Sequence, residues 1–362
     1  MNRELGTLAW AFLRLGTVAF GGPAAHIAMM EDEFVRRRQW LTRQEFLDLV
    51  GAASLIPGPS STEVAIYVGY RRAGWRGLLL AGTCFILPAA LIVTALAMVY
   101  VRAGHLPALV GALHGVKAIV IAVVAQALVG FARTAVKGPG LLALGAAAAA
   151  ASLLGGMPVA ILLGAGVLCL LVRAADGKGA AMVAPATAAG LTKLLAVFLK
   201  IGAVVFGSGY VLLAFLRDDV VLKNHWLTEG QLIDAVAVGQ VTPGPVFTTA
   251  TFIGYLVAGG PGAVVATVGI FLPSFLLVAV SGPLIPRLRR SRLAGAFLDG
   301  VNVASLALMV VVTLQLARAA LVDVTTVALA VASAVLLFRW RVSSVWLVLG
   351  GGIVGVLEQL LR

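Results

Sequence analysis

Hydrophobic residues run in long stretches along this chain, and short polar segments separate them. In the first half, five such stretches predict helices that cross a lipid bilayer, at about 5–29, 75–101, 107–132, 140–154 and 157–172. Two shorter pieces, 44–56 and 60–72, flank Pro57-Gly58-Pro59 between the first two stretches. Neither piece is long enough to cross, so we expect the pair to form a re-entrant helical hairpin.

The same pattern occurs a second time. Residues 12–20 (FLRLGTVAF) return as 198–206 (FLKIGAVVF) at an offset of 186, and the Pro-Gly-Pro turn returns as Pro243-Gly244-Pro245. After a one-residue gap the match continues at an offset of 185. A period this long is typical of a duplicated membrane transporter. We therefore predict an N-terminal membrane repeat at 1–173, a cytoplasmic linker at 174–190 and a C-terminal membrane repeat at 191–362.

The number of crossings in each repeat predicts the topology. Five crossings is an odd number, so the second repeat must be inserted upside down relative to the first. We expect an all-α integral membrane protein of two inverted-topology repeats, with about ten spanning helices and two re-entrant helical hairpins. With this topology, 17 of the 27 basic residues fall on one side of the membrane and 6 on the other. This bias predicts that both termini are periplasmic.

Composition agrees with a membrane protein. The chain is 61% hydrophobic and 12% charged, which leaves too little polar surface for a water-soluble globule. Its net charge of +12 comes from short basic clusters between apolar stretches, so we expect lipid and not nucleic acid as its surroundings. Cys84 and Cys169 lie in apolar segments and are interpreted as small buried side chains. The N-terminal segment is interpreted as a structural helix, not a cleaved signal peptide.

Motifs for enzymatic chemistry are not found in the sequence. It has no Walker motif, no zinc-type spacing and no nucleophile elbow. We therefore predict a non-enzymatic protein with no catalytic residue, no metal site and no cofactor. The sequence leaves a homodimer open.

Two basic residues stand at the same repeat position, each near the middle of a predicted span. They are Arg14 and Lys200. A cation at such a depth costs from about 2.5 kcal/mol upward, so these residues usually face a polar cavity or a partner. Inverted symmetry would bring the two toward one another, where they would bind a small dianion. The alternative is that each side chain extends along its helix to the membrane surface.

Each repeat also contains two helix breaks. Phe20-Gly21-Gly22-Pro23 interrupts the first span, and Phe206-Gly207-Ser208-Gly209 interrupts its counterpart. A helix that begins after such a break presents free N–H groups, which bind anions. Hydroxyl groups follow the Pro-Gly-Pro breaks and would add donors for an oxyanion: Ser60, Ser61 and Thr62, and then Thr248, Thr249 and Thr251. The alternative is ordinary breaks whose hydroxyls bond to nearby backbone carbonyls.

Four residues are candidates for proton coupling. Glu63 has a neutral repeat partner, Thr249, but Ser60 to Glu63 also fits a capping box, in which Glu63 would only accept a backbone N–H. His26 follows the first break and is either a titrating group or a structural residue. Asp48 and Asp234 are matched on the two hairpins. Other charges, such as those at 31–38, are interpreted as interfacial helices with i,i+4 pairs, and Lys117 matches the polar Asn302.

These residues together resemble the chromate ion transporter (CHR) family in its long, two-domain form. The resemblance rests on F-L-R-L-G-x-x-x-F-G-G-P at 12–23, His26, W-L-T at 40–42, P-G-P at 57–59, G-Y-R-R-A-G at 69–74 and the second F-G-S-G and P-G-P. It implies a bacterial inner-membrane exporter of chromate, driven by the membrane potential or the proton gradient, that confers chromate resistance. A transporter of sulfate or another tetrahedral oxyanion, and an anion channel, are the alternatives.

Overall fold

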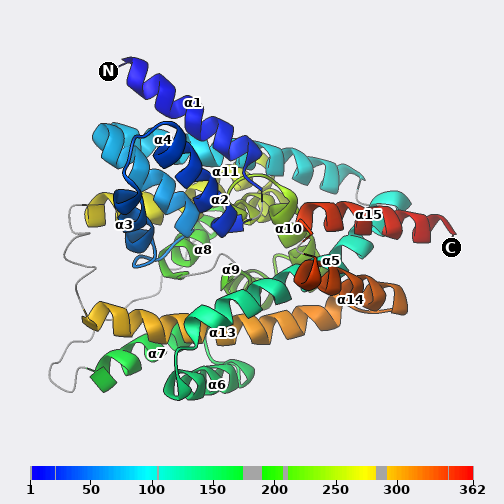
Figure 1. Cartoon of the computed structure of the whole chain (residues 1–362). Helices are drawn as coiled ribbons and strands as arrows, with labels where there is room; N and C mark the ends of the chain where they lie inside the picture. The colour runs from blue at the N-terminus through cyan, green and yellow to red at the C-terminus, as the bar shows by residue number, and fades with distance from the viewer. Residues whose placement is uncertain are drawn as a thin grey trace.

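The computed structural model of the chain is helical throughout the residues that it describes (Figure 1). These are residues 2–20, 22–103, 106–173, 190–206, 211–282, 292–340 and 342–361. No strand occurs in these ranges, which confirms the all-α prediction for this part of the chain. The predicted linker lies outside the described residues except for Gly190, and so do four residues of the predicted breaks, Gly21, Gly207, Ser208 and Gly209.

The two halves contain the same elements in the same order. The first half has α1 (Asn2–Val18), α2 (Gly22–Glu31), a π-helical segment (Asp32–Arg37), α3 (Arg43–Ala53), α4 (Ser60–Ala103), α5 (Pro107–Ala135), α6 (Pro139–Leu153) and α7 (Pro158–Arg173). The second half has α8 (Leu191–Val204), α9 (Leu212–Leu216), a π-helical segment (Arg217–Lys223), α10 (Glu229–Val241), a 3-10 turn (Val246–Thr248), α11 (Thr249–Ser281), α13 (Arg292–Ala320), α14 (Val324–Arg339) and α15 (Ser344–Leu361).

The likeness between the halves extends to backbone angles. Helix α4 is kinked at Ala73 (φ −143°, ψ 27°) and Gly74 (φ 59°, ψ −147°), and α11 is kinked at Ala258 (φ −147°, ψ 28°) and Gly259 (φ 61°, ψ −151°). The positive φ of the second residue disfavours any side chain, which explains a glycine at both positions. A capping box begins α3 at Thr42 and α10 at Thr228. The sequence repeat is therefore also a structural repeat.

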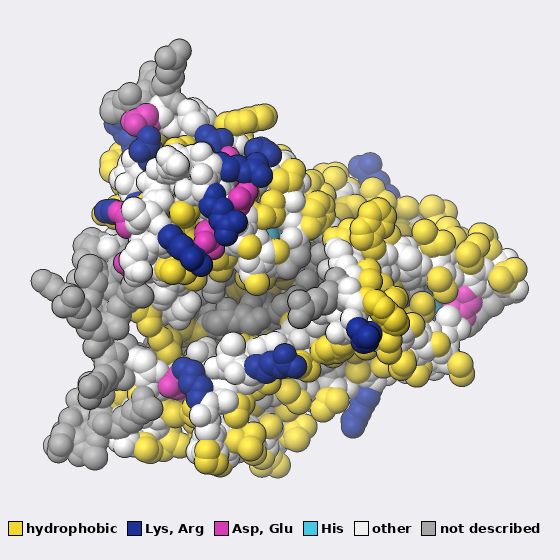
Figure 2. Space-filling view, in the orientation of Figure 1, with side chains coloured by type: hydrophobic (Ala, Val, Ile, Leu, Met, Phe, Trp, Pro, Cys, Tyr) yellow, Lys and Arg dark blue, Asp and Glu magenta, His cyan; other side chains and the backbone are white. Residues whose placement is uncertain are grey.

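Within the part of the chain that the structure describes, length and composition allow five segments to cross a membrane. They are Ser60–Ala103, Pro107–Ala135, Val246–Ser281, Gly295–Ala320 and Ser344–Leu361, and α6, 158–172 and α14 are shorter apolar helices. The predicted first span at 5–29 is two helices, because the chain leaves helical geometry after Val18 and α2 begins at Gly22, next to Pro23. The predicted pieces 60–72 and 75–101 are the two helical parts of α4, which are separated by the non-helical residues Ala73 and Gly74. The two parts fold back on each other there, since a Cβ on Gly69 would lie 2.3 Å from the carbonyl oxygen of Gly77. Side chains on the outside of α4, α11 and α15 are largely apolar, which suits contact with lipid (Figure 2).

Helices of each half pack against helices of the other half. Helix α5 of the first half packs against α14 and α15 of the second, and α13 of the second half packs against α6 and α7 of the first (Figure 1). Glycines allow the close crossings, since a Cβ on Gly115 of α5 would lie 2.0 Å from the carbonyl oxygen of Gly351 in α15. At the matched crossing, a Cβ on Gly300 of α13 would lie 2.3 Å from the carbonyl oxygen of Ala165 in α7. Small residues at such crossings let transmembrane helices approach closely.

Gly115→Leu is expected to destabilise the protein, because the added side chain must push α15 away from α5. The cost should be about 1–3 kcal/mol or more, the range for overpacked sites. Thermal unfolding of the purified protein in detergent measures it. Gly130→Leu on the same helix is the control, since a Cβ there meets no atom within 4 Å. Equal melting temperatures for the two variants would contradict this account of the crossing.

Candidate functional site

The helix breaks of the two halves meet through a crossed pair of backbone hydrogen bonds. The N–H of Gly58, in the first Pro-Gly-Pro turn, donates to the carbonyl of Val205, which ends α8 in the second half, at 2.7 Å. The N–H of Gly244, in the second turn, donates to the carbonyl of Ala19, which ends α1 in the first half, at 2.8 Å. Each Pro-Gly-Pro turn is thus bound to the broken first helix of the other half. The structure thus joins each Pro-Gly-Pro turn to the described residue that follows the first helix of the other half.

The crossing is too tight for any residue but glycine in either turn. A Cβ on Gly244 would lie 2.7 Å from the Cβ of Ala89. A Cβ on Gly58 would lie 2.2 Å from Oε1 of Glu63 and 2.4 Å from Oγ of Ser274. The turn of each half therefore touches a long helix of the other half: Gly244 lies against Ala89 of α4, and Gly58 lies against Ser274 of α11.

Glu63 is fully buried in the first turn of α4. Neither of its carboxyl oxygens has a hydrogen-bond partner of good geometry, and the same holds for the hydroxyls of Thr62 and Ser274, although the Ser274 hydroxyl on α11 is the polar group beside the carboxyl. The capping box, which was the alternative for Ser60 to Glu63, is not formed, because the Glu63 carboxyl accepts no backbone N–H and lies between Gly58 and Ser274. An unpaired buried polar group costs about 1–3 kcal/mol, so such a cluster calls for a functional explanation.

His26 is also buried, and both of its ring nitrogens have neighbours. Nε2 lies 3.0 Å from the carbonyl oxygen of Ala19, and Nδ1 lies 3.3 Å from Oγ of Ser61. Since a carbonyl only accepts, Nε2 carries a hydrogen, and the Ser61 hydroxyl is left to donate to Nδ1 of the neutral ring. His26 therefore links α2 and the start of α4 to the same carbonyl that accepts from Gly244.

Arg14 and Lys200 each lie beside a carboxylate of their own half. Nη1 of Arg14 is 3.9 Å from Oε2 of Glu33, and Lys200 forms an ion pair with Asp219. Both cations are partly exposed, at 52% and 41%, whereas Glu33 and Asp219 are nearly buried, at 11% and 3%. The structure thus pairs Arg14 and Lys200 with acids and does not show them paired with each other.

The acidic partners of these cations were missed from the sequence, although a signal was present. Glu33 and Asp219 are separated by 186 residues, the same offset that relates Arg14 to Lys200. The prediction of i,i+4 pairs was also largely wrong, because these segments are π-helical and a π-helix brings i and i+5 together. The ion pairs accordingly join Asp32 to Arg37, Glu33 to Arg38 and Asp218 to Lys223, and only Asp219 to Lys223 has the i,i+4 spacing.

The pocket beside Arg14 has mixed charge. Its volume is about 380 Å³, and it lies between α1, α2 and the first π-helical segment. Its lining includes Arg14, Asp32, Glu33 and Arg37 together with apolar residues such as Val18. Any anion that enters this pocket must compete with the two carboxylates for the two cations, since Arg14 lies beside Glu33 and Arg37 pairs with Asp32.

The hydroxyls that follow the second Pro-Gly-Pro turn bond within the protein. Thr248 donates to the carbonyl of Pro245 and Thr249 to that of Val246, each at 2.8 Å, and Oγ1 of Thr251 lies 2.7 Å from Oγ1 of Thr267. For Thr248 and Thr249 this is the alternative that the sequence left open, whereas Thr251 bonds to another hydroxyl and not to a backbone carbonyl. In the first half, Ser61 faces His26, and Ser60 stands at the start of α4, directly after Pro59.

The matched aspartates have different surroundings. Asp48 of α3 is half-buried and accepts from Gln44 at 3.0 Å. Asp234 of α10 is buried, accepts from the Tyr100 hydroxyl at 2.9 Å and lies 3.3 Å from Nζ of Lys117. The pair from Lys117 to Asp234 joins the two halves, so Lys117 has a buried acid as its partner.

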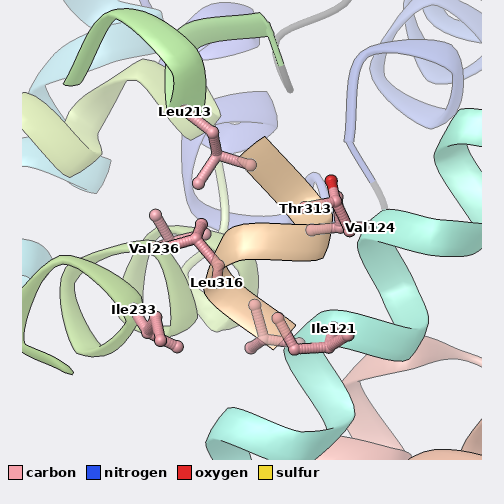
Figure 3. Close-up of a pocket in the computed structure, with 8 residues that line it drawn as sticks. Ile121, Val124, Leu213, Ile233, Val236, Thr313 and Leu316 are labelled. Atoms are coloured by element: carbon pink, nitrogen blue, oxygen red, sulfur yellow. The ribbon is translucent and has the colours of Figure 1, made fainter. Parts of the chain in front are cut away.

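The difference between the aspartates reflects how the two hairpins pack. Helix α10 packs against both α5 and α13, whereas α3 packs against α2 and α4, and its described residues make no comparable contact with α5 or α13. Around α10 the packing is dense. The cavity there is about 10 Å³, roughly room for one water molecule, and its apolar lining comes from α5, α9, α10 and α13 (Figure 3). Around α3 the packing is more open: Figure 2 shows the surface hollowed between the elements α1 to α4 and α13.

Comparisons with known proteins agree with this duplicated architecture. The model of the family described as "Chromate transporter" matches the chain twice, at residues 6–170 and 192–356. The chain is 36% identical to a "Chromate transport protein" of Cupriavidus metallidurans, over 97% of this chain and 92% of that one. It is 35% identical to a "Probable chromate transport protein" of Synechococcus elongatus, over 83% and 82%. A "Chromate transport protein" of Pseudomonas aeruginosa is 32% identical over 95% and 90%.

No solved structure matches the chain. The relatives are named as transport proteins and not as enzymes. Apolar helices long enough to cross a bilayer are present in both halves of the chain, as in a multi-pass membrane protein. With the family model covering both halves, the chain belongs to the chromate transporter family.

Proposed function

We propose that this protein is a secondary active transporter that exports chromate across the inner membrane of a bacterium and so confers chromate resistance. Its energy comes from the proton gradient or the membrane potential. The observation that carries the proposal is the crossed pair of hydrogen bonds from Gly58 to Val205 and from Gly244 to Ala19. It gathers the helix breaks of both halves at one interface, in a chain that is similar over nearly its whole length to proteins named for chromate transport.

Chromate is a dianion, and its site must replace the water that surrounds it in solution. In this proposal, backbone N–H groups at the glycine-rich breaks supply part of that replacement: those of Gly21 and Gly22, and those of Gly207, Ser208 and Gly209. The N–H groups of Gly58 and Gly244 are donated to Val205 and Ala19, so the Pro-Gly-Pro turns hold the breaks in place. Arg14 and Lys200 supply positive charge. In the absence of substrate, Glu33 and Asp219 balance that charge. An arriving dianion competes with these carboxylates, which keeps binding reversible, as transport requires.

In the proposed transport cycle, the two inverted repeats exchange roles: the hairpin helix that is docked in one state is undocked in the other. Inverted repeats can adopt two states in which each repeat takes the conformation of the other, because a pseudo-two-fold axis in the membrane plane relates them. In the structure, α10 is docked on α5 and α13 and α3 is not. In the other state, α3 docks and α10 separates. Asp48 then approaches Asn302, since these are the counterparts of Asp234 and Lys117.

Replacing both Arg14 and Lys200 by Gln is expected to lower chromate flux about tenfold or more, because the site loses both charges. Tracer chromate uptake into inverted membrane vesicles measures this, normalised to the amount of protein in the membrane. Lys193→Gln is the control, since Lys193 is an exposed cation on the same helix as Lys200. Adding excess unlabelled sulfate tests the alternative substrate. Full flux in the double variant would remove these cations from the site.

A cysteine pair at positions 48 and 302 is expected to cross-link only while the transporter turns over. The background lacks Cys84 and Cys169, and a short bis-maleimide serves as the linker. A pair at 117 and 234 is the control and should cross-link without substrate, because these residues are already in contact. The measurement is the fraction of cross-linked protein with and without chromate. A pair at 48 and 302 that never reacts under turnover would contradict the exchange of roles.

A further inference from the structure

The two crossing points are equivalent in backbone but differ in chemistry. At one, the Pro-Gly-Pro glycine is Gly244, and the side chain nearest to it is that of Ala89 on α4. At the other, the glycine is Gly58, and the side chains against it are Glu63 and Ser274. Ser274 is the repeat counterpart of Ala89, at the offset of 185. Glu63 likewise has a neutral counterpart, Thr249, whose hydroxyl bonds to the carbonyl of Val246.

This difference shows that the fold does not require the polar pair. The same turn, the same crossed hydrogen bond and the same helix kink are built in the other half with alanine and threonine at these positions. An acid and a hydroxyl without partners are a cost to stability at a buried position. A group that the fold does not need, placed where it costs stability, points to a ligand.

The surroundings of Glu63 limit what that ligand can be. No cation among the described residues forms an ion pair with Glu63. The nearest titratable group on its own helix is Tyr67, whose hydroxyl lies 2.6 Å from Oγ of Ser281 on α11. On α2, His26 contacts the neighbouring residue Ser61 and not Glu63. A buried carboxyl with no cation beside it accepts positive charge most readily as a proton, after which its O–H has Ser274 Oγ as the adjacent acceptor.

The pair is also divided between the halves. Glu63 belongs to the first half and Ser274 to the second, and Gly58, which lies against both, is bound to Val205 of the second half. Any movement of one half against the other changes the distance between the carboxyl and the hydroxyl. A proton held here is therefore favoured in one state of the transporter and disfavoured in the other, which is the property that couples an ion to a conformational change.

We infer that Glu63 and Ser274 form the site of the coupling proton, with Glu63 as the group that takes up and releases it and Ser274 as the residue that positions it. The inference rests on the proposed transport function, and it selects Glu63 from the four residues that the sequence offers for proton coupling. In one state the Glu63 carboxyl takes up the proton, and the adjacent Ser274 hydroxyl is the acceptor for its O–H. In the other state the shift of one half against the other removes Ser274 from the carboxyl and lets water reach it. The proton then leaves to water.

Infrared difference spectroscopy of the purified full-length protein tests the site without relying on transport. Raising the pH should remove the C=O stretching band of a protonated carboxyl in the wild type. In Glu63→Gln that band should be absent. In Ser274→Ala it should persist at a shifted frequency, because the hydrogen bond to the hydroxyl is lost. Ala89 shows that the fold accepts alanine at this position, so this variant should remain folded if Glu63→Gln does not. A band unchanged in both variants overturns the inference.

Proteoliposomes test the coupling itself. In the wild type, an imposed pH gradient should drive uphill accumulation of tracer chromate, and Glu63→Gln should reduce the accumulated ratio about tenfold or more. Accumulation in Glu63→Gln equal to the wild type overturns the inference. Replacing choline by sodium at constant pH should change nothing, and a requirement for sodium would assign this site to that ion instead. If the wild type moves no chromate but keeps the infrared band, the proposed function fails while the proton site stands.

Discussion

The structure depends on how the backbone N–H and carbonyl groups at the helix breaks of each half find hydrogen-bond partners away from water. A broken helix end within a membrane protein leaves N–H and carbonyl groups that lipid cannot bond. Here the carbonyls of Ala19 and Val205 are met by glycines of the opposite half. The two halves are thus joined at the points where each is incomplete. This arrangement creates a polar interface inside an apolar bundle, and Glu63 and His26 lie directly beside it.

Charge in this protein is placed in two different ways. Around Arg14 and Lys200 the cations are half-exposed and balanced by acids on the π-helical segments. At Glu63 the acid is fully buried, and no cation among the described residues forms an ion pair with it. The first arrangement suits a ligand that arrives with its own charge and displaces a counterion. The second suits a proton, which a buried carboxyl can bind without any other ligand. The separation of the two agrees with a protein that handles an anion and a coupling ion at different positions.

Much of the architecture could be predicted from local patterns. The apolar stretch at 107–132 corresponds to α5 (Pro107–Ala135), because its length and the proline at its start define the helix. The internal repeat anticipated the matched elements. Three features were out of reach for distinct reasons. The π-helical segments change the spacing of ion pairs without any marked change in composition. The crossed hydrogen bonds join residues far apart in the chain. The unequal docking of α3 and α10 depends on how the two halves pack against each other. Because the two hairpins have similar sequences, the sequence does not show which of them is docked.

The packing of helices between the halves has a consequence for how the chain is made. Helix α5 packs against α14 and α15, which lie much further along the chain and are therefore synthesised later. The glycine-lined face of α5, at Gly111 and Gly115, stays uncovered until α15 has been made. Loss of α15 would therefore expose a helix of the first half.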